Sequence, residues 1–105
     1  MKNKAMNALI DMGMPADIKG FRYISEIMEI FENEEFRMMG MVDLYKFVGK
    51  QNDTTSSQVE RAIRHAFSVV LEKGNLETVG KYLTFQHPTN GNLLHTFYIR
   101  LKQEG

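Results

Sequence analysis

The sequence predicts an all-α domain, a compact bundle of about six helices that contains a helix-turn-helix. Most apolar residues recur every three or four positions, which is the spacing of one helix face. Only two prolines interrupt the 105 residues. Polar caps and glycines mark the ends of the periodic segments. A chain of this length forms one domain, so we expect residues 1–105 to be a single helix-turn-helix domain.

Three segments in the first half of the chain follow the helical pattern. The first spans about residues 3–12, and Gly13 is expected to end it in the left-handed conformation. The second spans about residues 17–33 and contains Gly20, which should weaken the helix by about 1 kcal/mol relative to alanine. The third is a short helix over about residues 42–50.

Two packing predictions concern the third segment and the methionines before it. The side chains of this segment expected to face inward include Val42, Tyr45 and Val48. The preceding methionines are interpreted as core filler, because a thioether side chain adapts to irregular gaps; the alternative is a Met-rich docking surface. These methionines are Met38, Met39 and Met41.

The clearest helix follows a polar turn at residues 53–57. The turn contains two overlapping capping-box patterns, one pairing Thr55 with Gln58 and the other pairing Ser57 with Glu60. The helix should end at Lys73 and Gly74, and a stripe of small and apolar side chains should bury one of its faces. That stripe consists of Val59, Ala62, Ile63, Ala66, Phe67 and Val70.

Two further helices are expected, over about residues 76–83 and 93–102, separated by a loop over residues 84–92. Together these segments give about six helices and no convincing strand.

The short helix, the polar turn and the long helix make a helix-turn-helix pattern, in which the second helix enters the major groove of DNA. The hydroxyl groups at its start could meet phosphates, and Arg61 and Arg64 could each bind guanine through two hydrogen bonds. Glu60 could accept a hydrogen bond from cytosine or close the capping box, and both interpretations stay open. His65 lies beside the arginines, where a lone surface histidine is seldom a ligand or a base.

Composition excludes several other classes of function. No cysteine is present, so disulfides, thiolate metal sites and cysteine nucleophiles are excluded. The three histidines are scattered and no carboxylate pair has acid–base spacing, so we expect neither an enzyme nor a metal or other cofactor. No apolar run approaches membrane-spanning length and the start does not resemble a signal peptide, so we expect a cytoplasmic protein without a membrane partner.

Charge is balanced overall but not along the chain. The formal net charge is zero, with −3 in residues 1–35 and +3 in residues 36–105. A polyanion should therefore approach the second part more readily than the first. The glutamates between Glu26 and Glu35 are interpreted as a solvated helix face, with a cationic partner as the alternative.

Four motifs give the chain a family resemblance. They are IDMGMPADIKGF at residues 10–21, QVERAIRHA at residues 58–66, KGN at residues 73–75 and PTN at residues 88–90. In this order and spacing they resemble the C-terminal effector domain of the sporulation master response regulators of endospore-forming bacteria. The resemblance extends over nearly the whole chain.

The resemblance implies a transcription regulator that binds tandem copies of a TGTCGAA-like box in double-stranded DNA. It also implies contact with the sigma subunit of RNA polymerase and a tandem or homodimeric arrangement on DNA. The implied base contacts are Gln58, Glu60, Arg61, Arg64 and His65. The implied contacts to the DNA backbone are Thr54, Thr55, Ser56, Ser57, Ser68, Thr89 and Asn90.

Three departures from the family pattern limit what the resemblance implies, and the first and third of them, with the zero net charge and the acidic second helix, support a second hypothesis. Gln58 stands where the best-known relatives carry arginine, and the loop before Pro88 is shorter than theirs. The receiver domain that normally precedes the effector domain is not expected in these 105 residues, so the chain is interpreted as an excised domain or a free-standing relative. The alternative function is therefore a protein-interaction module that kept the fold, lost specific DNA binding and acts on a full-length regulator.

Overall fold

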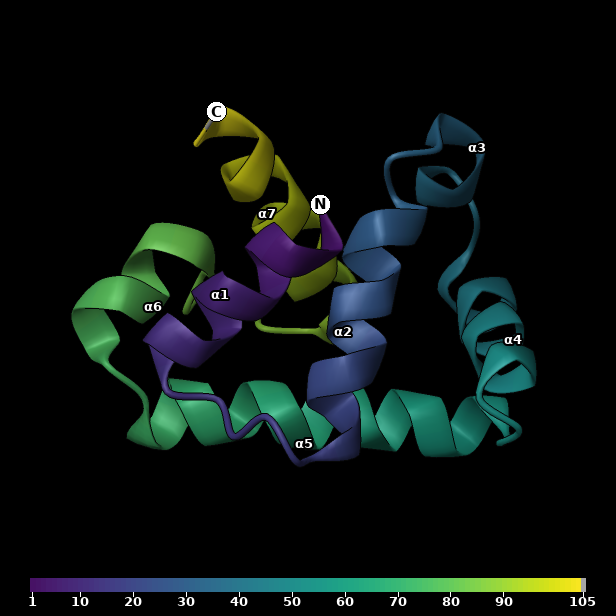
Figure 1. The fold of residues 1–105 in the computed structure, drawn as a ribbon, viewed down its shortest axis with the longest axis horizontal. Helices are drawn as coiled ribbons and strands as arrows, with labels where there is room; N and C mark the ends of the chain where they lie inside the picture. Colours follow the sequence, from purple (N-terminus) through teal and green to yellow (C-terminus); the bar gives the residue numbers. More distant parts are fainter. Residues whose placement is uncertain (105) are drawn as a thin grey trace.

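The computed structural model describes residues 1–104, which form seven helices and no strand (Figure 1). The all-α prediction is confirmed, and the helix beyond the expected six is the one-turn α3. None of the helices in the described chain is long and apolar enough to cross a membrane. The helices are α1 (Lys2–Met12), α2 (Lys19–Ile30), α3 (Glu34–Arg37), α4 (Met41–Gln51), α5 (Ser56–Lys73), α6 (Leu76–Tyr82) and α7 (Asn90–Gln103).

The long helix α5 runs along one edge of the molecule, and α2, α4, α6 and α7 pack against one side of it (Figure 1). Helix α2 crosses its middle, α4 lies near its beginning, and α6 lies near its end. The predicted apolar stripe is confirmed, because five of its six side chains are buried in the core and Ala62 is half-buried. The opposite side of α5 is left to solvent.

Helices α2 and α5 touch at Gly20. A Cβ atom at this position would lie 2.3 Å from the carbonyl oxygen of Ala62 and 2.5 Å from the Cβ of Ala66. Both distances are shorter than any van der Waals contact, so only glycine lets the two helices approach this closely. Gly20 therefore allows close packing between α2 and α5, although glycine lowers the helix propensity of α2 at this position.

The end of α1 is fixed as predicted by Gly13, which has φ 98° in the left-handed region. Its N–H donates to the carbonyl oxygen of Ile10 at 2.9 Å. The neighbouring carbonyl of Met12 accepts from the N–H of Asn75 at 3.0 Å, which ties the end of α1 to the start of α6.

Two of the predicted packing roles are wrong. Val42 is 63% exposed and Met38 is 81% exposed, while Met39 and Met41 pack at the edge of the core as expected. Leu44 is buried on α4 and, at about 100° per residue, Val42 lies about 160° from it around the helix. The two side chains therefore cannot both face the core.

Two element boundaries also differ from the prediction. Helix α2 ends at Ile30 because Asn33 is the N-cap of α3, where its side chain accepts from the N–H of Glu35 at 2.9 Å. Helix α7 begins at Asn90, three residues earlier than expected, because the side chain of Thr89 caps it.

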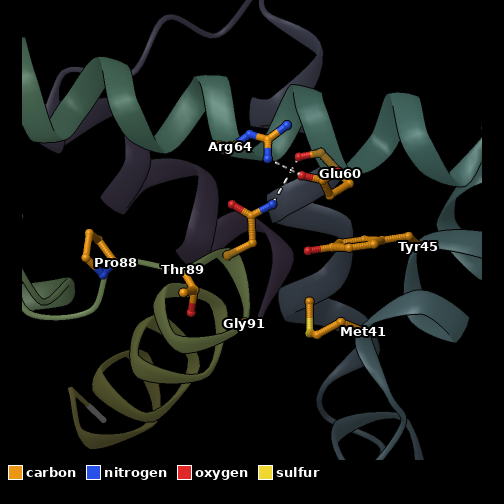
Figure 2. Close-up of a pocket in the computed structure, with 8 residues that line it drawn as sticks. Met41, Tyr45, Glu60, Arg64, Pro88, Thr89 and Gly91 are labelled. Carbon is orange, nitrogen blue, oxygen red and sulfur yellow. Dashed lines mark hydrogen bonds and ion pairs between the residues drawn. The ribbon is translucent and has the colours of Figure 1, made fainter.

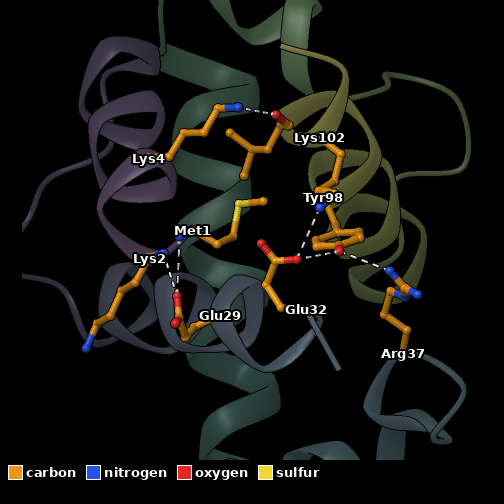
Figure 3. Close-up of polar contacts among 9 residues, drawn as sticks. Met1, Lys2, Lys4, Glu29, Glu32, Arg37, Tyr98 and Lys102 are labelled. Carbon is orange, nitrogen blue, oxygen red and sulfur yellow. Dashed lines mark hydrogen bonds and ion pairs between the residues drawn. The ribbon is translucent and has the colours of Figure 1, made fainter. Parts of the chain in front are cut away.

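A chain of polar contacts joins the ends of α2, α3 and α7 on the side away from α5 (Figure 3). Arg37 donates to the Tyr98 hydroxyl at 2.9 Å, and that hydroxyl donates to Glu32 at 3.1 Å. Lys102 also pairs with Glu32, at 3.3 Å. Desolvation raises the pKa of Glu32, but the hydrogen bonds from Tyr98 and Lys102 outweigh it, so the pKa lies below its usual value.

The half-buried His95 ring stacks on Phe31, with 4.9 Å between the ring centroids. Burial, and then the charge of Arg37, lower the pKa of His95. The pKa of His95 is therefore lower in the folded chain than in the unfolded chain. At pH values between these two, His95 is protonated more fully in the unfolded chain. We expect the free energy of unfolding to fall as the pH drops below about 6.5, the usual histidine pKa.

This prediction is checked by urea unfolding at several pH values between 7.5 and 5.5. His95→Gln should flatten the dependence of the free energy of unfolding on pH. Equal slopes for wild type and His95→Gln would contradict the prediction.

Candidate nucleic-acid interface

The turn between α4 and α5 is tightly packed. Asp53 adopts φ 54°, and the N–H of Thr54 donates to the carbonyl oxygen of Gly49 at 2.8 Å. A Cβ atom on Gly49 would lie 2.7 Å from the carbonyl oxygen of Thr54. The turn is therefore folded directly onto the last turn of α4, which fixes where α5 begins.

At the start of α5, the predicted cap by Thr55 is confirmed and the predicted capping box of Ser57 with Glu60 is wrong. Thr55 is the N-cap, and its side chain accepts from the N–H of Gln58 at 3.1 Å. The Gln58 side chain accepts from the Thr54 hydroxyl, so the first capping box is only half formed. The second predicted capping box, between Ser57 and Glu60, does not form. Ser57 lies inside the helix, and the Glu60 carboxylate pairs with Arg64.

The solvent-facing side of α5 presents Arg61, Arg64 and His65, all of which are exposed. Within residues 1–104, Arg61 has no ion-pair partner. Arg64 pairs with Glu60 at 2.7 Å, one turn earlier, but its side chain stays 64% exposed. Neither guanidinium is buried by the fold, so both can reach a ligand.

A cleft of about 540 Å³ lies beside this face, between α4, α5 and the start of α7 (Figure 2). Asn90 donates from its side-chain amide to the backbone carbonyl of Glu60 at 3.0 Å, which joins the start of α7 to the second turn of α5. Tyr45 of α4 points its hydroxyl into the cleft. Burial raises the pKa of Tyr45 and outweighs the hydrogen bond with Asn90, which lowers it; the hydroxyl is a hydrogen-bond donor at neutral pH, as in any tyrosine.

Five of the predicted backbone contacts have partners inside the protein, among them Thr54 and Thr55, whose hydroxyls bond to Gln58 as described. The Ser68 hydroxyl donates to the His65 carbonyl at 2.7 Å, the Thr89 side chain caps α7, and Asn90 binds α5 as described. Thr89 and Asn90 nevertheless line the same cleft as Glu60 and Arg64, although about 25 residues separate them in sequence. The hydroxyl residues at the start of α5 are exposed or half-buried; they are Thr54, Thr55, Ser56 and Ser57.

Sequence reasoning missed two cations beside the turn. Lys19 and Arg22, from the first turn of α2, line a second cleft, of about 300 Å³, together with Thr54 and Gln58. Helical periodicity placed both on the polar face of α2, but nothing in the pattern showed that this face meets the start of α5. No group of three or more histidine and acidic side chains in residues 1–104 is arranged to hold a metal ion.

The short helix α4, the tight turn and the arginine-bearing helix α5 are typical of the helix-turn-helix class of DNA-binding domains. The family model described as sporulation initiation factor Spo0A C terminal matches residues 5–101. The chain therefore belongs to that family, the C-terminal DNA-binding domains of sporulation regulators. The resemblance noted in the sequence is confirmed.

Proposed function

We propose that this chain is a single helix-turn-helix domain that binds double-stranded DNA sequence-specifically and regulates transcription in the cytoplasm. The observation that best supports the proposal is the exposed guanidinium of Arg61 on the outer face of α5, which has no ion-pair partner within residues 1–104. Arg64 follows on the same face, and a planar guanidinium forms two hydrogen bonds with the major-groove edge of guanine.

In this proposal α5 lies in the major groove. Bases are contacted by Gln58, Glu60, Arg61, Arg64 and His65, and phosphates by the hydroxyl residues of the turn together with Ser68, Thr89 and Asn90. Arg64 must leave Glu60 to reach a base, which costs little because exposed pairs of this spacing contribute only about 0.3–0.5 kcal/mol. The site itself is a pair of TGTCGAA-like boxes, occupied by tandem or paired copies that contact the sigma subunit of RNA polymerase.

Fluorescence anisotropy tests this function directly. The protein is titrated into a labelled duplex with two TGTCGAA-like boxes and, at the same salt concentration, into a duplex of scrambled sequence. We expect clearly tighter binding to the boxes, and equal affinity for the two duplexes would contradict specific recognition.

The second candidate function is a protein-interaction module acting on a full-length regulator. It is favoured by the zero net charge and by the exposed apolar side chains of Met38 and Val42. Size-exclusion chromatography with a full-length regulator of the family tests it. A stable complex together with equal affinity for box and scrambled duplexes would favour this function over the first.

A further inference from the structure

The first turn of α2 adds a positive flank to the outer face of α5. Lys19 and Arg22 lie in the same cleft as Gln58 and Thr54, although the two pairs are more than 30 residues apart in sequence. The close helix crossing at Gly20 explains this, because it brings the start of α2 against α5. Figure 1 shows α2 beginning beside α5.

This flank continues the surface that carries Arg61. Gln58 and Arg61 are three residues apart in α5, so their side chains are neighbours on one helix face. The Oε1 of Gln58 accepts from the Thr54 hydroxyl, which leaves the amide N–H groups of Gln58 as donors. The cleft therefore presents a neutral donor next to two cations.

Two cations and one carboxylate line the cleft, and a second carboxylate, that of Glu26, contacts one of the cations. Lys19 has no ion-pair partner within residues 1–104, and its side chain is free to move toward a ligand. Arg22 contacts Glu26 at 3.6 Å and keeps 69% of its side chain exposed. Asp53 lines the same cleft and opposes them with one negative charge.

We propose that Lys19 and Arg22, which line a cleft with the base-contacting Gln58, bind a phosphate of the DNA backbone at the edge of the groove that α5 enters. This inference rests on the proposed DNA binding and extends its surface to a second helix. The proposed phosphate contact lies on the side of α5 opposite the Glu60–Asn90 cleft. Side chains of other helices therefore flank α5 on both sides.

The test measures affinity for box and scrambled duplexes over a series of salt concentrations. Lys19→Ala should weaken binding to both duplexes by the same factor, and should reduce the slope of log affinity against log salt by about 0.9. Lys19→Arg should restore both the affinity and the salt slope of the wild type. Asp53→Asn should act in the opposite direction and strengthen binding to both duplexes.

Lys81→Ala is the matched control, because Lys81 is also exposed on a helix but lies on α6, at the other end of α5. Its affinity and salt slope should equal those of the wild type. If Lys19→Ala also matches the wild type, the inference is overturned and the proposed function stands. If the wild type binds both duplexes equally, the proposed function fails, and the Lys19 comparison still decides the phosphate contact. If no duplex is bound, both are overturned.

Discussion

Replacing Arg61 with alanine should weaken binding to the specific duplex by about 1–3 kcal/mol and relax the preference at one base pair. Arg61 is exposed and has no ion-pair partner in the described chain, so its hydrogen bonds to DNA replace only bonds to water. Anisotropy titrations against duplexes with single base-pair changes measure the effect. The position at which the variant no longer discriminates is the base pair that Arg61 contacts.

Arg61→Lys is the control for charge, because lysine keeps the cation but loses the planar pair of donors. It should retain affinity for scrambled duplex and lose discrimination. If Arg61→Ala instead weakens every duplex equally, Arg61 contacts phosphate. If it changes nothing, the outer face of α5 is not the DNA-binding surface.

Replacing Gly20 with alanine should lower the free energy of unfolding by about 1–3 kcal/mol. The added methyl group would lie 2.3 Å from the carbonyl oxygen of Ala62, a backbone atom that cannot move without shifting α5. Urea unfolding followed by circular dichroism measures the change.

Gly80→Ala is the matched control, because Gly80 is also helical and a Cβ atom there meets nothing within 4 Å. This variant should be more stable than the wild type by up to about 1 kcal/mol, the gain in helix propensity. The difference between the two variants then measures the packing at the α2–α5 crossing. If Gly20→Ala were as stable as Gly80→Ala, the close crossing would be contradicted.

The sequence predicted most of the fold because local signals agree with the tertiary structure. The Thr55 cap, the buried stripe of α5 and the left-handed Gly13 each depend on residues a few positions apart. Val42 was wrongly predicted to face the core, because a short helix with several apolar residues could bury more than one of its faces. The one-turn α3 is too short to produce a periodic pattern at all.

The candidate site was only partly predictable from the sequence. The outward position of Arg61 and Arg64 follows from helix geometry alone, and the structure leaves both exposed. Their surroundings depend on contacts between distant segments, namely Asn90 with the Glu60 carbonyl and Lys19 with the Gln58 cleft. No pattern within one helix encodes these pairings.

The hydrogen bond from Asn90 to the Glu60 carbonyl has a consequence for protein engineering. Because the last helix is hydrogen-bonded to the second turn of α5, a fragment made of residues 41–73 alone would keep both arginines and lose this support for the helix that carries them. If the proposed function holds, grafting the two-helix unit alone onto another scaffold should lose specificity, and a chimera should also include the C-terminal segment that begins near Thr89.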